Sequence, residues 1–391
     1  MDPLYISRFA IASSAGIGAG AMLEALRSRR TGLAACDFET AVLDTWVGQV
    51  PNQALAPLPA GCERFDCRNN RIAHLALVQD GFDQSVRAAR DRYGADRIGV
   101  FLGTSTSGIL QTELAYRRRA ADGSLPDDFL YGTTHNNFSL AWFLQSSLGL
   151  TGPAAVISTA CSSSAKAFAN AARMISAGLC DAAVVGGVDS LCLTTLYGFG
   201  SLGLLSAGPC RPFDAERDGI SIGEGGAFLL LEKTASGDAI RLLGVGESSD
   251  AYHMSSPHPE GLGAQLAMRA ALASADMTPQ DVDYINLHGT GTRANDETEG
   301  KAISAVFGDD VACSSTKGWT GHTLGACGAI EAVICLLAIR HGFLPGSANT
   351  RKLDPSIRLR YLVQNENLAA QLVMSNAFGF GGTNCSLVLG S

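Results

Sequence analysis

Short apolar runs alternate along the chain with longer segments of helical composition. Strand-like runs lie at residues 97–103 (RIGVFLG), 155–158 (AVIS) and 182–186 (AAVVG), because brief apolar runs bounded by turn residues are typical of buried strands. Helical composition marks residues 163–178 and 329–341, and a glycine ends or follows each segment. This alternation predicts an α/β fold, with a mostly buried sheet covered by helices.

The order of these elements hints at an internal duplication. Residues 155–187 run strand, Cys-Ser-rich turn, small-residue helix and strand, and residues 310–346 show a similar order. A glycine-centred apolar hairpin is expected near the end of each half, at residues 219–232 and 378–390. The two halves are therefore expected to resemble each other.

The boundary between the halves is expected at a short polar stretch, residues 235–238 (ASGD). It divides the chain into an N-terminal half, residues 1–238, and a C-terminal half, residues 239–391. A length of 391 residues would by itself suggest two or three domains, but intertwined α/β folds of this size can look like one.

The N-terminal region shows apolar character without the features of a targeting segment. Residues 9–23 are apolar and small, like the core of a signal peptide, but Asp2 precedes them and there is no basic region. The stretch fits better a strand, a glycine turn and the start of a helix. No run of about 18 uncharged apolar residues follows anywhere, so we expect no membrane-spanning helix.

Composition narrows the class of protein. The chain carries 29 Lys and Arg against 37 Asp and Glu, a formal net charge of −8, which argues against a general nucleic-acid binder. Its 45 glycines cluster beside Ser, Thr and Asn, as in tight turns that line a site. The 11 cysteines show no paired metal-ligand spacing, so we expect reduced core thiols in a cytoplasmic protein and no metal site.

One cysteine stands apart. Cys161 (VISTACSSSAKAFA) follows a strand-like run and precedes a predicted helix, in a turn of small residues. A thiol there meets the positive end of the helix dipole and its unpaired N–H groups, which favour the nucleophilic thiolate. A buried structural cysteine at a helix start remains the alternative.

Two histidines occupy comparable positions. His288 (NLHGTGTRAND) follows an apolar run, and His322 (STKGWTGHTLGACG) lies in a glycine-rich turn before a helix. A single histidine in such a turn is more often a structural residue. Together with Cys161, however, the two imidazoles suit acyl transfer, because they could donate hydrogen bonds to a developing oxyanion or hold a carboxylate.

Further candidates surround these residues in the sequence. Lys317 precedes His322 among Ser, Thr and Gly rather than among surface charges, and an ion pair with Glu331 or Glu299 could hold the shape of a site. Phe378 and Phe380 alternate with glycines (NAFGFGGTN). That turn could be a mobile gate, could aim a backbone N–H at a reacting oxygen, or could simply be anchored by aromatic packing.

Several motifs occur in order over nearly the whole chain. They are TACSSS at Cys161, HGTGT at His288, KGWTGHTLGACGAIEA at 317–332, NAFGFGGTN at 376–384, PCRPFDAERDG at 209–219 and SDAYHMSSP at 249–257. At this spacing they resemble the β-ketoacyl-acyl-carrier-protein (ACP) synthases of the Cys-His-His group, members of the thiolase superfamily.

The resemblance implies a thiolase-like fold with two similar halves in a five-layered αβαβα arrangement. It implies a 3-oxoacyl-ACP synthase, which condenses an acyl thioester with malonyl-ACP, with loss of carbon dioxide, in fatty acid or polyketide biosynthesis. The partners would be acyl-ACP, malonyl-ACP and a second subunit, either an identical copy or a related ketosynthase-like chain. Neither a metal nor a redox cofactor is expected.

The resemblance also assigns residues. Cys161 would carry the acyl group, while His288 and His322 would promote decarboxylation of malonyl-ACP and stabilise the enolate. Lys317 would support the site with Glu331, and Phe380 would gate it. The backbone amides of Cys161 and Phe380 would form an oxyanion hole. The residues expected to line the pantetheine tunnel are Thr290, Thr292 and Ser255. Residues 104–109 and 199–202 are expected to line the acyl pocket or its wall at the dimer interface.

The chain departs from this family at the surface expected to dock ACP. Arg68 and Arg71 (CRNNR) match one basic docking position, but Asp127 and Asp128 stand where basic side chains are usual, and Gly203 stands where an arginine is common. Residues 117–119 (RRR) could substitute, because an acidic ACP needs a basic face. The departures suggest a specialised synthase, for example of aryl-polyene-like or other polyketide synthesis, working beside a partner subunit.

Two other functions stay open at this point. One is a non-condensing ACP-binding subunit of a ketosynthase heterodimer, although such partners lack the active cysteine. The other is a thiolase that uses coenzyme A; in thiolases a second cysteine lies in a Cys-Gly motif near the C-terminus, whereas here Cys385 follows Asn384. Type III synthases use Cys-His-Asn, and His322 argues against them.

Overall fold

A computed structural model describes residues 1–234 and 240–391 of the chain. The strands are β1 (Leu4–Ser13), β2 (Ala34–Ala35), β3 (Trp46–Gly48), β4 (Ile98–Gly103), β5 (Ala154–Ile157), β6 (Ala182–Asp189), β7 (Ile222–Gly223), β8 (Gly225–Glu232), β9 (Arg241–Ser249), β10 (Tyr284–Asn286), β11 (Ala312–Ser314), β12 (Leu372–Gly379) and β13 (Thr383–Gly390). The helices are α1 (Ala19–Ser28), α2 (Arg68–Leu77), α3 (Phe82–Tyr93), α4 (Ile109–Arg117), α5 (Ser139–Leu148), α6 (Ser163–Ser176), α7 (Leu193–Ser201), α8 (Leu262–Ala275), α9 (Arg293–Phe307), α10 (Lys317–Thr320) and α11 (Cys327–His341). The strands and helices predicted from the apolar pattern are therefore present, and the predicted boundary at 235–238 lies outside the described residues.

The main sheet is built from two equivalent sets of strands. Its order is β11-β10-β12-β13-β9-β1-β8-β6-β4-β5, so each half contributes five consecutive strands. From either edge of the sheet inward, the first two strand pairings are parallel and the next two pairings are antiparallel. The halves meet where β1 pairs with β9 over Leu4–Leu242 and Tyr5–Arg241. This repeated topology confirms the expected two similar halves.

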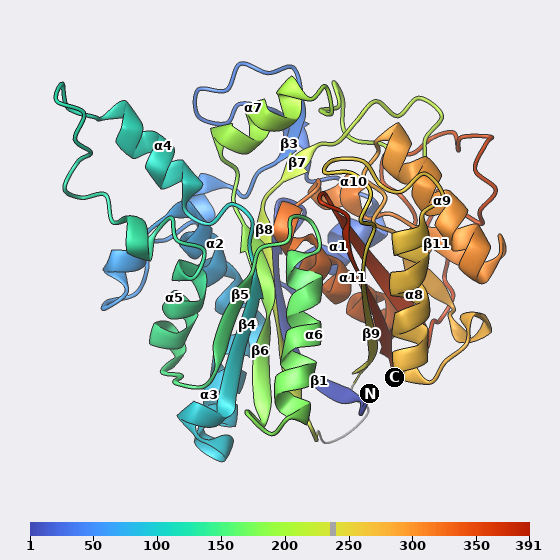
Figure 1. The fold of residues 1–391 in the computed structure, drawn as a ribbon, viewed down its shortest axis with the longest axis horizontal. Coiled ribbons are helices and arrows are strands. Elements are labelled where there is room, and N and C mark those ends of the chain that lie inside the picture. Colours follow the sequence, from blue (N-terminus) through green and yellow to red (C-terminus); the bar gives the residue numbers. More distant parts are fainter. Residues whose placement is uncertain (235–239) are drawn as a thin grey trace.

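Helices and strands stack in five layers (Figure 1). Helices α2, α3 and α5 cover the outer face of the N-terminal strands, and α8 covers the outer face of β9 and β13. Between the two sets of strands lie α6 and α11, which contact each other and strands of both halves. The architecture is the αβαβα arrangement expected for a thiolase-like fold.

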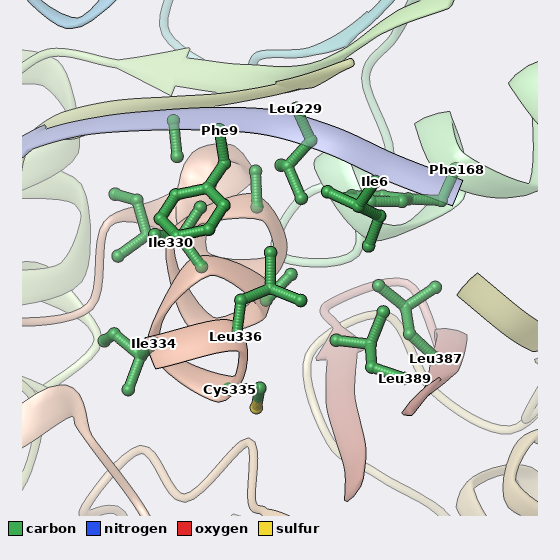
Figure 2. Packing of buried hydrophobic residues seen from close by; sticks show 14 of the residues in the cluster. Ile6, Phe9, Phe168, Leu229, Ile330, Ile334, Cys335, Leu336, Leu387 and Leu389 are labelled. Carbon is green, nitrogen blue, oxygen red and sulfur yellow. The ribbon is translucent and has the colours of Figure 1, made fainter. Parts of the chain in front are cut away.

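Alternate side chains along the strands pack into different hydrophobic cores, because successive side chains of a pleated strand point to opposite faces. In β8, Leu229 and Leu231 face the central core, whereas Phe228 and Leu230 face the core under the outer helices. Figure 2 shows Phe9 and Leu229 opposite Ile330, Ile334 and Leu336 of α11, with Leu387 and Leu389 of β13 nearby. Strands buried on both faces explain why the sequence shows continuous apolar runs rather than alternation.

The central helix α11 is apolar on all sides and almost fully buried. The helical run Leu324–His341 has a mean hydropathy of 1.6 and is long and apolar enough, by composition, to cross a membrane, but 83% of it is buried inside the protein. It packs against α6 and against strands of both halves. A helix that is apolar on all sides fits such a position in the core of a large soluble domain as well as it fits a membrane.

One of the two predicted hairpins is wrong. Residues 219–232 contain β7 and β8, but β7 pairs with β3 in a separate three-stranded sheet, while β8 pairs with β1 and β6. Only Glu224 separates β7 from β8, so the chain passes directly from one sheet to the other. The second hairpin is confirmed, because β12 and β13 pair from Leu372–Gly390 to Gly379–Thr383.

A buried carboxylate links the two halves beside the end of β6. Asp189 is fully buried and accepts hydrogen bonds from the hydroxyls and backbone N–H groups of Ser105 and Thr106 and from the hydroxyl of Thr104. It also accepts the N–H of Gly325, which follows the His322 turn. The N-terminal loop after β4 is thereby fixed to the turn before α11.

Replacing Asp189 with alanine should strongly destabilise the protein. The change leaves several buried donors without an acceptor, and we expect the free energy of unfolding to fall by about 3 kcal/mol. Urea unfolding followed by circular dichroism measures it. Asp127→Ala, at an exposed aspartate, is the matched control and should change stability by less than about 0.5 kcal/mol. Equal stability of the two variants would contradict the structural role of Asp189.

Candidate active site

The predicted nucleophile lies at the junction of a strand and a central helix. Cys161 follows β5 and precedes α6, whose first residue is Ser163. Ala160 has a φ of 51°, in the left-handed region that costs a non-glycine residue about 1–2 kcal/mol. This sharp bend turns the chain so that the Cys161 thiol, 6% exposed, faces the cavity described below.

Both predicted histidines lie beside this thiol. The Nε2 atom of His322 is 3.0 Å from the Cys161 Sγ. The His288 ring packs edge-on against the His322 ring, with centroids 5.2 Å apart and an interplanar angle of 82°. The N-terminal half thus supplies the thiol and the C-terminal half supplies both imidazoles, so the structure brings together residues that lie far apart in the sequence.

Lys317 is buried against His288 and Glu331. Its Nζ donates to the Glu331 Oε1 at 2.6 Å, to the His288 backbone oxygen, and toward the His288 Nδ1 at 3.3 Å. Burial lowers the pKa of Lys317, but the charge of Glu331 outweighs burial and raises that pKa above its usual value. Lys317 is therefore charged, although burial also raises the pKa of Glu331 to about 7, and the ammonium leaves the His288 Nδ1 as an acceptor.

Glu299 has a different role from the expected ion pair with Lys317. Its two carboxylate oxygens accept the backbone N–H groups of His288 at 2.8 Å and Gly289 at 2.7 Å. Burial raises the pKa of Glu299 to about 7, although these N–H groups oppose the shift. Glu299 fixes the backbone that carries His288, whereas Glu331 is the ionic partner of Lys317.

The ionisation of the site differs from the sequence prediction. Burial raises the pKa of the Cys161 thiol to about 11, and the charge of Lys317 and the backbone N–H of Phe380 only partly offset it. Burial and the nearby Lys317 charge lower the pKa of both His288 and His322 well below the usual value. The resting site therefore holds a neutral thiol beside neutral imidazoles, rather than a thiolate formed by the helix dipole.

This ionisation state predicts the pH dependence of Cys161 alkylation. Because the thiolate is the reactive form, its rate of reaction with iodoacetamide should rise about tenfold per unit from about pH 7 to about pH 9, without a plateau. Mass spectrometry of the Cys161 peptide measures the rate, and Cys36, the one cysteine that is not buried, is the reference in the same digest. If the rate instead stayed the same across this pH range, Cys161 would already be a thiolate at the lowest pH.

The distances also bear on metal binding. Ligand atoms of Cys161, His288 and His322 lie within 4.8 Å of one another, as do those of His288, Cys327 and Glu331. The Lys317 ammonium lies 3.3 Å from the His288 Nδ1, however, and would repel a second cation. The arrangement suits proton and oxyanion chemistry better than metal ligation.

A cavity of about 430 Å³ leads from Cys161 to the surface. Thr290, Thr292 and Ser255, the residues predicted for the pantetheine tunnel, all line it. Phe380 also lines the cavity, is 37% exposed, and packs on Phe199 with centroids 5.8 Å apart. Phe378 lies deeper, with its ring centroid 6.1 Å from that of His288. Phe380 is thus placed between Cys161 and Phe199, where a gate would act.

The predicted docking arginines are engaged within the chain. The Arg68 side chain is 10% exposed and donates to the buried Glu224, with one distance of 2.8 Å. Arg71 pairs with Asp66. Their role in docking stays a prediction, and Arg68 has little charge left to offer an outside partner.

The arginine run proposed as a substitute is also partly neutralised. Arg117 pairs with Glu39 at 3.6 Å, and Arg118 pairs with Asp128 at 2.8 Å. Asp128, one of the unexpected acidic residues, therefore has a partner on the same arm of the structure. Of the run, Arg119 forms no ion pair among the described residues.

Sequence reasoning missed two residues of the site. Asp189, which fixes the turn after His322, stands inconspicuously in GGVDSL. Arg293 lines the cavity and directly follows Thr292 in HGTGTRAND. Arg293 could have been noticed in the sequence, because it is a charged residue within a motif of small residues. The role of Asp189 is visible only in the fold.

Comparison with known families identifies the family to which the chain belongs. The model of the "Beta-ketoacyl synthase, N-terminal domain" matches residues 71–236, and the model of the "Beta-ketoacyl synthase, C-terminal domain" matches residues 240–351. The chain belongs to the β-ketoacyl synthase family. The two matched segments contain Cys161 and the His288–Lys317–His322 group respectively.

Individual relatives agree with this assignment. The chain is 39% identical over 327 residues to nodulation protein E of Rhizobium meliloti (strain 1021), covering 81% of this chain and 79% of that protein. It is 33% identical over 353 residues to 3-oxoacyl-[acyl-carrier-protein] synthase 2 of Vibrio cholerae, covering 84% and 85% of the two chains.

Among solved structures, a chain from the complex of the ketosynthase ApeO with its chain length factor ApeC, from Xenorhabdus doucetiae, superposes with a TM-score of 0.92. The sequence identity is 40%, over 100% of this chain and 98% of the matched chain. These relatives confirm the prediction of a thiolase-like β-ketoacyl-ACP synthase, an acyltransferase of fatty acid or polyketide biosynthesis.

Proposed function

We propose that this β-ketoacyl synthase extends acyl chains through a thioester on Cys161, by decarboxylative condensation with malonyl-ACP. The observation that carries the proposal is the contact of the Cys161 thiol with the His322 imidazole at 3.0 Å, at the inner end of a cavity that also reaches His288. A thiol beside an imidazole is the arrangement that nucleophilic acyl transfer needs.

In the first step, His322 accepts the thiol proton through Nε2 while the sulfur attacks the acyl thioester. The neutral state of His322 suits this role, because a protonated imidazole could not accept the proton. The backbone N–H groups of Cys161 and Phe380 are directed at the sulfur and can stabilise the developing oxyanion. The carrier thiol then leaves with a proton, and the acyl group remains on Cys161.

In the second step, malonyl-ACP loses carbon dioxide and becomes an enolate. Since Lys317 donates toward the His288 Nδ1, the proton of the neutral His288 ring resides on Nε2. His288 can therefore donate a hydrogen bond to the thioester oxygen on which negative charge develops. The enolate carbon attacks the acyl-Cys161 carbonyl, the carbon–carbon bond forms, and the Cys161 sulfur is released. Ser255, Thr290 and Thr292 would hold the pantetheine arm.

We further propose that the enzyme works as a dimer paired through β5. This strand is the last in the main sheet, and its outer edge has no partner strand among the described residues. Its residues are only partly buried, and the neighbouring helix α5 exposes Trp142. An open edge of this kind is suited to pairing with a strand of a second chain.

A related ketosynthase-like chain is the partner we favour over an identical copy. The matched chain that covers the whole length of this chain at 40% identity comes from a complex of a ketosynthase with its chain length factor. The altered docking surface also favours a specialised synthase of the aryl-polyene or another polyketide type. The relatives are biosynthetic synthases, which is consistent with a soluble protein, and we propose that it acts in the cytoplasm.

The experiment is intact-mass analysis of the purified chain, alone and co-expressed with a chain-length-factor-like partner. With a panel of acyl-ACPs, a preferred acyl group should add to the protein, and malonyl-ACP should then yield the 3-oxoacyl product and carbon dioxide. Failure of both preparations to load or to decarboxylate malonyl-ACP would favour a non-condensing subunit. Cleavage of acetoacetyl-CoA without ACP would favour a thiolase.

A further inference from the structure

The charged residues that line the cavity differ in how far they are already paired. Arg217 is fully buried and lies near three carboxylates, those of Asp296 at 3.5 Å, Glu297 at 3.2 Å and Asp354 at 2.6 Å. Its charge is satisfied, and it holds α9 to the loops beside it.

The two lining aspartates are also engaged. Asp218 accepts the Ser206 hydroxyl at 2.6 Å and lies 3.7 Å from Arg211. Asp250 accepts the Asn384 side-chain amide at 2.8 Å. Both carboxylates therefore have hydrogen-bond partners within the chain, and only Asp218 also lies near a cation, Arg211.

Arg293 is the exception. Its side chain is exposed and lines the same cavity, and its guanidinium forms no hydrogen bond or ion pair with any described residue. It directly follows Thr292, whose hydroxyl lies 3.0 Å from that of Thr290. An unpaired arginine therefore stands beside the two threonines proposed to hold the pantetheine arm.

We propose that Arg293 binds the phosphate group of the 4′-phosphopantetheine arm of the carrier. This inference rests on the proposed function, because the arm enters the cavity only if its thioester reaches Cys161. When it does, the phosphate at the other end of the arm lies near the surface, where Arg293 is. A guanidinium matches phosphate oxygens in geometry and charge. Arg293 thus positions the substrate by its non-reacting end.

A contact between Arg293 and the phosphate would also explain how the carrier protein can bind to a chain whose expected docking surface has few unpaired cations. Arg68, Arg71, Arg117 and Arg118 are all paired within the chain. Recognition of the phosphate would not depend on the surface charges of the carrier protein, since every carrier has the same phosphopantetheine arm.

The test compares two small thioesters of the same acyl group, one on 4′-phosphopantetheine and one on pantetheine, which lacks the phosphate. In the full chain with its partner, Arg293→Met should lower kcat/KM for acylation of Cys161 by the phosphorylated thioester about tenfold, equivalent to about 1.4 kcal/mol. The rate with the pantetheine thioester should stay within about twofold. Arg293→Lys should recover part of the loss. Arg358→Met, at an exposed arginine away from the cavity, is the matched control and should change neither rate.

Each other outcome is informative. An equal fall with both thioesters, or no fall with either, would overturn the assignment to the phosphate. A fall seen with acyl-ACP but not with free acyl-phosphopantetheine would assign Arg293 to the carrier protein instead. Failure of the unmodified enzyme to be acylated by any of these thioesters would reject the proposed function itself.

Discussion

Replacing Cys161 with alanine is expected to abolish both the acyl-enzyme and the condensation product. The thiol is the one nucleophile in contact with His322 among the described residues, at 3.0 Å, and no hydroxyl stands in its place once the sulfur is gone. The protein should still fold, because loss of a single buried sulfur costs little packing area. Intact mass spectrometry after incubation with acyl-ACP should show no added acyl group.

The matched control is Cys36→Ala, which removes a thiol outside the site. It should load an acyl group and condense at the rate of the unmodified protein. Acylation of the Cys161→Ala variant, followed by product formation, would show that another residue is the nucleophile. Loss of activity in the control would point instead to a general effect on folding.

Replacing Lys317 with methionine should damage both stability and catalysis. The ammonium is 1% exposed and its partner Glu331 is 3% exposed, 2.6 Å away. Removing one member of a buried ion pair leaves the other charge uncompensated, and we expect the free energy of unfolding to fall by about 3–5 kcal/mol. The His288 backbone oxygen loses a donor as well, and a misplaced His288 ring should slow decarboxylation of malonyl-ACP about 100-fold.

A double variant separates these two effects. Lys317→Met combined with Glu331→Gln removes both charges, so urea unfolding should show that much of the lost stability returns. The rate of decarboxylation should not return, since nothing then holds the His288 Nδ1 as an acceptor. Recovery of the rate together with stability would mean that Lys317 acts only through folding.

The sequence was sufficient for much of the fold because its strands are buried on both faces. The continuous apolar runs that became β4, β5 and β6 could be recognised directly, and so could the small-residue helix α6. The segment at 219–232 was misjudged as a hairpin because its glycines suggest a tight turn, whereas the partners of β7 and β8 are distant in sequence. Local patterns do not reveal such long-range pairing.

The sequence motifs indicated which residues form the site, but not how deeply those residues are buried or which charges surround them. Cys161, His288, His322 and Lys317 do come together, but the sequence favoured a thiolate at Cys161. The helix start argues for that state, and only the coordinates show that complete burial opposes it more strongly, with a pKa of about 11. Likewise, nothing in the sequence indicates that Arg68 is paired with Glu224.

The division of the site between the two halves has a consequence for synthesis of the protein. Cys161 is made well before His288, Lys317 and His322, and before Phe380 at the turn between β12 and β13. A ribosome-bound chain that has exposed only its N-terminal half carries the thiol without its proton acceptor His322 and without the backbone N–H of Phe380, one of the two oxyanion donors. Cys161 therefore becomes competent for acyl transfer with His322 only when the last strands have joined the sheet.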